Sequence, residues 1–149
     1  MGQITDRPVE LQELKRLGLR RQLNELDYKR ALKAASAVAT QATIGKVLGM
    51  SQPAVHSSLK TAATVDDVVA DFGSGSPTEA CKRYAAGLIG RDELVRQLKA
   101  WPYKMMPEPN EHGEYEESTD GTFNEVIVAS YLGLIDDSIY SEVSNHFTK

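Results

Sequence analysis

Residues 41–60, QATIGKVLGMSQPAVHSSLK, place two glycines and one valine at spacings that strongly restrict how this stretch can fold. Where two short helices cross, Gly45 leaves room for close approach, and Gly49 tolerates the positive φ of a tight turn between them. Val55 then points back from the second helix into the core. The remaining apolar positions of this helix pair are Ile44, Leu48, Met50 and Leu59. The segment therefore predicts two packed helices joined by a short turn.

The same stretch resembles the helix-turn-helix of bacterial and phage transcriptional regulators, many of which carry a similar LG-x-SQ-x-x-V-x-x-x-L run. The resemblance covers Gln41 to Lys60 and extends loosely to the preceding helix. Two positions depart from the usual pattern. The fifth position is usually alanine and here is Gly45, and the eighteenth is usually apolar and here is Ser58, with Leu59 one step later. No alternating strand pair follows, so the resemblance implies a non-winged helix-turn-helix that reads the major groove.

The expected contacts with DNA follow from the geometry of such a motif. Ser51 is expected to cap the second helix, residues 51–60, and Gln52 in its first turn can pair bidentately with adenine. Thr40 or Gln41, at the start of the supporting helix, is expected to bond a phosphate and set the register. The residues expected to contact DNA are Thr40, Gln41, Thr43, Ser51, Gln52, Pro53, Ala54, His56, Ser57 and Lys60.

Charge is divided unevenly along the chain, whose net charge is −4. Residues 1–64 hold ten Lys/Arg and five Asp/Glu, whereas residues 65–149 hold seven Lys/Arg and sixteen Asp/Glu. The split favours a first part that faces nucleic acid, although two ordinarily solvated surfaces would give the same numbers. Five further bases could extend the phosphate contacts or simply be solvated: Arg20, Arg21, Lys29, Arg30 and Lys33.

The patterns elsewhere predict an all-α fold in two parts. Leucines between residues 11 and 26 predict a helix that begins at Pro8 and is interrupted near Gly18, and YKRALKAASAVA predicts another helix after it. Residues 66–76 end in a Gly/Ser cluster that predicts a linker. We therefore expect a DNA-binding domain at residues 1–65 and an acidic helical domain at residues 77–149.

The second domain contains two similar stretches, residues 76–98 and 121–143, which share the sequence Gly-Leu-Ile. Each is expected to begin with a capping box, at Ser76 and at Thr122, and to break at a left-handed glycine, Gly87 or Gly133. We expect an N-terminal helix-turn-helix bundle followed by two short helical hairpins, with an acidic loop near residues 107–121 between them. That loop could be simply solvated or could dock a basic partner.

Several classes of function find no support in the sequence. No apolar run approaches the roughly 18 residues that a membrane span needs, and no apolar signal core opens the chain, so a cytoplasmic protein is expected. A single cysteine, Cys81, excludes a disulfide framework. The histidines lack metal-ligand spacing, and the Gly/Ser cluster lacks the lysine of a phosphate loop. We predict no enzyme, no catalytic residue, no metal site and no cofactor.

Two functions remain open. The resemblance implies a transcriptional regulator, a repressor in our hypothesis, that binds double-stranded DNA as a homodimer because a single motif reaches useful specificity only in pairs. The alternative is an antitoxin-type protein, whose acidic C-terminal part neutralises a basic protein partner while the N-terminal part regulates its own gene.

Overall fold

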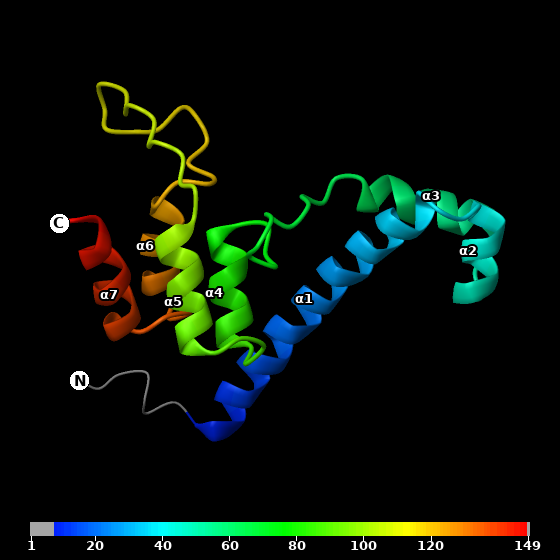
Figure 1. The fold of residues 1–149 in the computed structure, drawn as a ribbon, viewed down its shortest axis with the longest axis horizontal. Helices are drawn as coiled ribbons and strands as arrows, with labels where there is room; N and C mark the ends of the chain where they lie inside the picture. The colour runs from blue at the N-terminus through cyan, green and yellow to red at the C-terminus, as the bar shows by residue number, and fades with distance from the viewer. Residues whose placement is uncertain (1–7, 149) are drawn as a thin grey trace. The chain divides into compact units, whose positions relative to one another are not determined.

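The computed structural model describes residues 8–148 and confirms the all-α class (Figure 1). Within that range the only strand-like pairing is one isolated bridge between Lys104 and Thr122. The helices are α1 (Val9–Ser36), α2 (Gln41–Leu48), α3 (Gln52–Ala62), α4 (Pro77–Ala85), α5 (Arg91–Ala100), α6 (Asn124–Tyr131) and α7 (Asp137–Phe147). They form two compact units. One unit comprises Arg20–Asp67, and the other comprises the described residues up to Leu19 together with those from Val68 onward.

Helix α1 runs without a break through Gly18, so the predicted interruption there is wrong. The stretch YKRALKAASAVA largely continues this helix and does not begin a second one. A Cβ placed on Gly18 would meet no other heavy atom within 4 Å, so this glycine marks neither a turn nor a close approach. One exposed helical glycine costs about 1 kcal/mol, and the leucine, arginine, glutamine and glutamate residues around it favour the helix strongly enough to offset that cost.

The unit that holds α2 and α3 has a small core against the second half of α1. Its buried side chains are Leu32, Ile44, Val55 and Ala62, and the partly buried Ala35, Ala39, Met50 and Leu59 pack against them. Leu59 thus fills the apolar position that Ser58 leaves open. Leu48, expected among the apolar positions of the pair, is instead 37% exposed.

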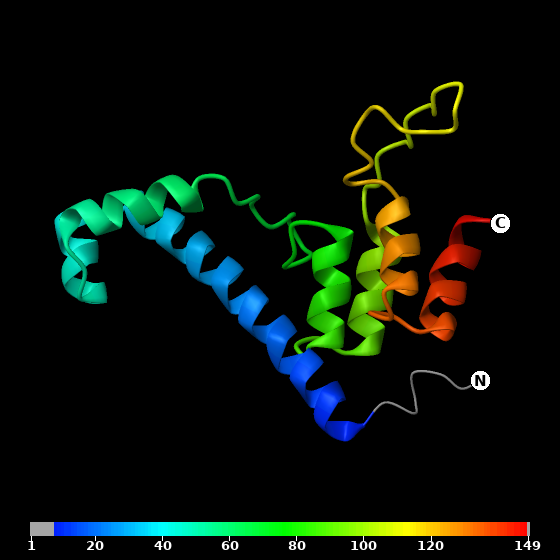
Figure 2. The same cartoon turned by 180° about the vertical axis from the view of Figure 1, so that it is seen from behind.

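The second unit contains the two predicted hairpins, α4–α5 and α6–α7, which lie side by side in Figures 1 and 2. Helix α4 contacts α6, and α5 contacts α7. Both turns have the predicted left-handed glycine, with φ 78° at Gly87 and 73° at Gly133. The N–H of the leucine that follows each glycine closes the turn: Leu88 donates to Arg83 O at 2.8 Å, and Leu134 donates to Ala129 O at 3.0 Å. Both turns therefore use the same C-terminal capping motif.

The two helix starts differ more than the sequence predicts. Ser76 caps α4 as expected, because its Oγ accepts a hydrogen bond from the backbone N–H of Glu79 at 3.1 Å. Thr122 does not cap α6, which begins at Asn124 after Phe123 and has no side-chain cap bond. The Thr122 hydroxyl donates to the carbonyl of Thr119 at 2.6 Å, and its oxygen accepts the backbone N–H of Asn124, two residues ahead, at 3.3 Å. The serine half of the predicted capping box is therefore present in the first hairpin, where the Glu79 carboxylate accepts the N–H of Gly75 at 2.9 Å and not that of Ser76, and the box is absent from the second hairpin.

Glu125, predicted as part of that second capping box, links the two hairpins. One carboxylate oxygen accepts hydrogen bonds from the backbone N–H and the hydroxyl of Thr78, at the start of α4. The other accepts from the backbone N–H of Gly121, just before α6. A single half-buried carboxylate thus satisfies backbone donors at the beginnings of two different helices.

Most of the stretch predicted as a linker, residues 66–76, packs against the second unit. Val69 N–H donates to Ser74 O at 2.8 Å and closes a loop in which Ser74 is fully buried. The Phe72 ring stacks on Trp101 with 4.8 Å between centroids, and the Arg96 guanidinium lies 5.8 Å from the Phe72 centroid. The Gly/Ser cluster therefore forms an ordered turn from Val68 onward.

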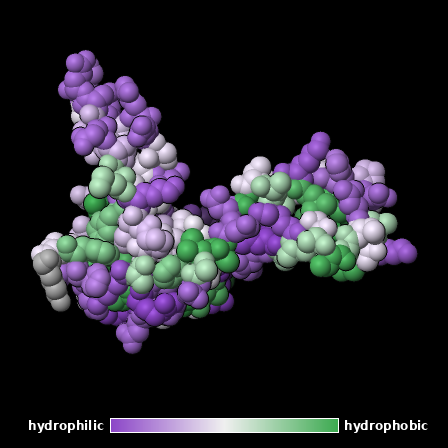
Figure 3. Space-filling view, turned by 45° about the horizontal axis from the view of Figure 1, so that its top comes forward, coloured by the Kyte–Doolittle hydropathy of each residue, from purple (hydrophilic) through white to green (hydrophobic). Residues whose placement is uncertain are grey.

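The acidic loop near residues 107–121 separates α5 from α6. Asn110 organises its tip, since its Oδ1 accepts the backbone N–H groups of His112 and Glu114, both at 2.9 Å. Six acidic side chains of the loop are exposed: Glu108, Glu111, Glu114, Glu116, Glu117 and Asp120. In the space-filling view the projecting part of this loop is almost uniformly hydrophilic (Figure 3).

Candidate nucleic-acid interface

The turn between α2 and α3 has the local geometry that the sequence predicts. Helix α2 ends at Leu48, and the next residue, Gly49, adopts φ 68° and ψ 34° and donates its N–H to the carbonyl of Gly45. The N–H of Met50 donates to the same carbonyl at 2.8 Å. The chain then enters α3 through Ser51, whose hydroxyl accepts the N–H of Ala54 at 3.3 Å. The left-handed glycine and the serine cap that follows it therefore fix the angle between α2 and α3.

Helix α2 approaches the turn very closely at Gly45. A Cβ on this residue would lie 2.6 Å from the carbonyl oxygen of Met50 and 3.5 Å from a methyl of Val55. Val55 itself is fully buried. Even alanine, the usual residue at this position of the motif, would press on the backbone of the turn. The glycine is therefore required by the close contact between α2 and the turn.

Helix α3 presents a polar surface around its first two turns. Gln52, Pro53, His56 and Ser57 are exposed and Ala54 is half-buried, whereas Val55 lies on the opposite, buried side. Lys60 is exposed further along the helix. The residues expected to meet base edges are thus presented to solvent on a helix whose other side is anchored in the core.

The start of α2 lies close to the exposed side of α3. Gln41 Nε2 and His56 Nδ1 are 3.3 Å apart and share a hydrogen bond, so two of the expected contact residues approach one another across the turn. Thr40 caps α2 by accepting the Thr43 N–H at 3.1 Å, and its hydroxyl donates to the Thr43 hydroxyl at 3.0 Å. Thr40 and Ser51 therefore hold helix starts with the same oxygens that we expected to face DNA.

Electrostatics distinguish α2 and α3 from the other described helices. Each of the other five carries an acidic residue in its first turn, and these two carry none. Residues 28–65 contain no aspartate or glutamate at all, while they contain the bases Lys29, Arg30, Lys33, Lys46 and Lys60. A helix N-terminus carries a partial positive charge. The starts of α2 and α3 keep that charge uncompensated, which favours an anionic ligand such as a phosphate.

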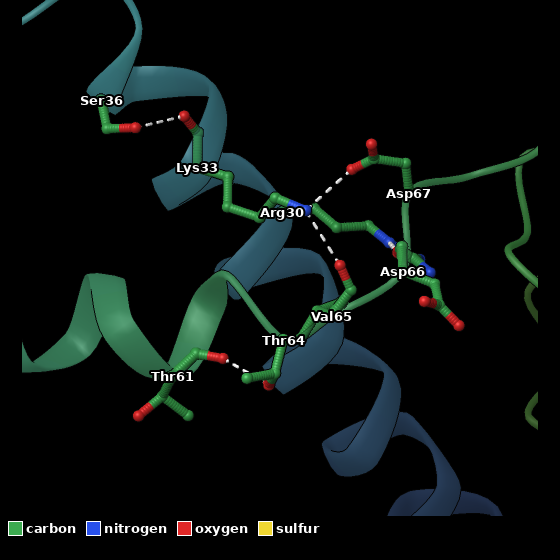
Figure 4. A network of polar contacts seen from close by, with 8 residues as sticks. All are labelled: Arg30, Lys33, Ser36, Thr61, Thr64, Val65, Asp66 and Asp67. Carbon is green, nitrogen blue, oxygen red and sulfur yellow. Dashed lines mark hydrogen bonds and ion pairs between the residues drawn. The ribbon is translucent and has the colours of Figure 1, made fainter.

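Two of the bases that we expected near phosphates hold the chain that follows α3 (Figure 4). Arg30 Nε donates to Asp66 O at 2.9 Å. Lys33 Nζ donates to Val65 O and to an Asp67 carboxylate oxygen, both at 2.9 Å. The hydrogen bond from Lys33 is the main cause that lowers the pKa of the Asp67 carboxyl. Sequence reasoning missed this role because the partners are more than thirty residues apart and no local pattern joins them.

Two kinds of feature are absent from the residues that the structure describes. Residues 8–148 contain no group of three or more His, Cys, Asp or Glu side chains that could hold a metal ion. None of the described helices combines the length and the apolar character that crossing a bilayer requires. Comparison with known proteins adds no assignment, since no family model, no curated protein and no solved structure matches this chain.

Proposed function

We propose that this protein is a sequence-specific regulator of transcription, a repressor, that binds double-stranded DNA through α2 and α3. One observation carries the proposal. The polar face of α3 belongs to a stretch, residues 28–65, that contains basic residues and no acidic ones, in a chain that is acidic as a whole. Such a surface suits a polyanion, and the turn geometry between α2 and α3 suits a major groove.

In this proposal the two ends of the interface have different tasks. The backbone N–H groups at the start of α2, together with Gln41, bond a phosphate and position the motif. Gln52 on α3 reads a base edge, and its amide can pair bidentately with adenine N6 and N7. Lys60 neutralises a phosphate further along the groove. Occupation of an operator would then block transcription.

Binding to DNA is tested by selection from fragmented genomic DNA, followed by a salt titration on the selected site. Each phosphate that a protein neutralises steepens the fall of affinity with salt by roughly 0.9 in the log–log slope. We expect a selectable site and a steep slope, which Lys60→Ala should reduce by about one. Failure to select any site, or affinity that does not change with salt, would refute the proposal.

The role of Gln52 is tested by substitution to alanine. Gln52→Ala should weaken binding by about 1–3 kcal/mol and relax preference at one base pair, because the lost contact is to a base. Gln22→Ala, the same substitution at an exposed position on α1, is the matched control and should leave the preference unchanged. If Gln52→Ala weakens every sequence equally, the glutamine contacts the backbone of DNA and not a base.

A second candidate function rests on the acidic loop. None of residues 105–148 is lysine or arginine, and the six exposed carboxylates of the loop lie within this stretch. We propose as the alternative that this surface neutralises a basic protein partner, as in an antitoxin. The test is co-purification of the full chain with the product of a short basic reading frame beside its gene. Changing Glu114, Glu116 and Glu117 to glutamine should abolish capture, and unchanged capture would exclude the loop.

A further inference from the structure

Helix α1 has apolar side chains on two opposite sides. Leu19 and Leu23 are buried, with 8% and 2% exposure, whereas Leu14 and Leu17 are 66% and 49% exposed. At about 100° per residue, the mean direction of the exposed pair is roughly opposite to that of the buried pair. A surface helix normally has one apolar side. The exposed leucines of α1 therefore present a second apolar side that the described part of the chain leaves open to solvent.

Four exposed residues form one line along this second side: Glu10, Leu14, Leu17 and Arg21. Their spacing of four, three and four residues is that of the contact line between two paired helices. The line has an acidic end, two leucines in the middle and a basic end. When a second copy of the line runs in the opposite direction, its basic end faces the acidic end of the first copy and its leucines face leucines. The line is therefore complementary to an antiparallel copy of itself.

We propose that two copies of this chain associate through α1, antiparallel, with the two-fold axis between Lys15 and Arg16. In that register Leu14 of each copy packs against Leu17 of the other, and Glu10 of each copy pairs with Arg21 of the other. A parallel arrangement would instead set Glu10 against Glu10 and Arg21 against Arg21, so charge selects the antiparallel one. An isologous pair of this kind closes on itself and forms a dimer.

The pairing cannot be satisfied within one copy. Residues 10 and 21 are eleven positions apart on one continuous helix, which separates them by about 16 Å along its axis. Within residues 8–148 neither Glu10 nor Arg21 forms an ion pair, in contrast to Glu13 and Arg16, which are paired at 2.6 Å. A second copy supplies a complement for each end at once.

Two further features favour close approach at this surface. Gly18 adjoins the line, and the space where its Cβ would lie has no heavy atom within 4 Å, so a neighbouring helix can come near the backbone. Leu11, 51% exposed, lies next to Leu14 on the helix. A second copy would cover more apolar surface than the leucine line alone.

Charge reversal tests the pairing on the full chain without DNA, so the result is independent of the DNA-binding proposal. Sedimentation equilibrium at low salt should show a dimer for the unaltered chain. Glu10→Arg and Arg21→Glu should each weaken the dimer about tenfold, since each places like charges together at both ends. Combining the two substitutions restores opposite charges between copies and should restore the dimer.

The control and the refuting outcomes follow from the same design. Glu117→Arg, which reverses an exposed charge in the acidic loop, should leave association unchanged. Leu14→Ala combined with Leu17→Ala should also weaken the dimer, with helix content by circular dichroism retained because both side chains are exposed. A monomeric unaltered chain refutes the proposal. A dimer that the single reversals leave unchanged, or a double reversal that fails to restore association, refutes the antiparallel register.

Discussion

Substituting Gly45 by alanine tests the contact on which the proposed motif depends. The new Cβ would lie 2.6 Å from Met50 O, about 0.8 Å closer than ordinary contact. The turn cannot easily retreat, because the carbonyl of Gly45 holds it through the N–H groups of Gly49 and Met50. Forced overpacking costs about 1–3 kcal/mol, and strain on these hydrogen bonds adds to it. The higher helix propensity of alanine stabilises the variant by only about 1 kcal/mol. We expect a net loss of about 1–3 kcal/mol.

Gly18→Ala is the matched control, since it places the same methyl on another helical glycine. No heavy atom lies within 4 Å of the position that this Cβ would take, so only the propensity gain remains, up to about 1 kcal/mol. Urea unfolding followed by circular dichroism should therefore shift its midpoint downward for Gly45→Ala and upward for Gly18→Ala. Low protein concentration keeps association from contributing to the shift.

The two substitutions are expected to shift the urea midpoint in opposite directions. If Gly45→Ala raises the urea midpoint as Gly18→Ala does, no close contact exists at Gly45 and the turn geometry described above is wrong. The same outcome would remove the structural support for placing α3 in a major groove. If both variants lower the urea midpoint, the methyl group at position 18 must clash with a neighbouring atom, and the space beside Gly18 is not open.

Two further predictions concern the second unit. Glu125→Ala should destabilise it by about 2–4 kcal/mol in urea unfolding, because donors of Thr78 and Gly121 lose a charged acceptor, whereas Glu117→Ala in the exposed loop should have almost no effect. Burial raises the pKa of the Cys81 thiol from 9.0 to about 12, with a smaller contribution from the charge of Glu125. The folded chain thus keeps a proton that the unfolded chain releases, so stability should fall by roughly 1.4 kcal/mol per pH unit between about pH 9 and 12. Cys81→Ala should remove that part of the slope.

The turn between α2 and α3 could be predicted from sequence because its determinants are local. The turn at Gly49 requires positive φ, Ser51 caps the N–H three residues ahead, and Val55 follows one helical turn later, so each constraint spans at most five residues. The same holds for the hairpin turns at Gly87 and Gly133. Where steric limits and capping bonds lie within one or two turns of a helix, the order of residues is sufficient to predict the structure.

The predictions that were wrong concerned structure that depends on many residues at once or on contacts between residues far apart in the sequence. A break at Gly18 was expected from one residue, although helix propensity is a sum over the whole window. Thr122 was expected to cap a helix from its spacing to Glu125, yet Thr78, forty-seven residues away from Glu125, engages that carboxylate. The neighbouring backbone takes up the hydroxyl of Thr122 instead. No pattern within a short stretch of sequence contains the information about these partners.

The ion pair between Lys33 and Asp67 connects these long-range contacts with the proposed interface. The acid-free stretch ends at Val65, so Asp66 and Asp67 are the acidic residues that follow α3 most closely in the chain. Lys33 binds the carboxylate of Asp67 and the carbonyl of Val65, and Arg30 binds the carbonyl of Asp66. Negative charge close to a phosphate would weaken binding, and Lys33 neutralises one of the two carboxylates. In the proposed complex Lys33 would therefore support DNA binding indirectly, by holding and neutralising the segment that follows α3.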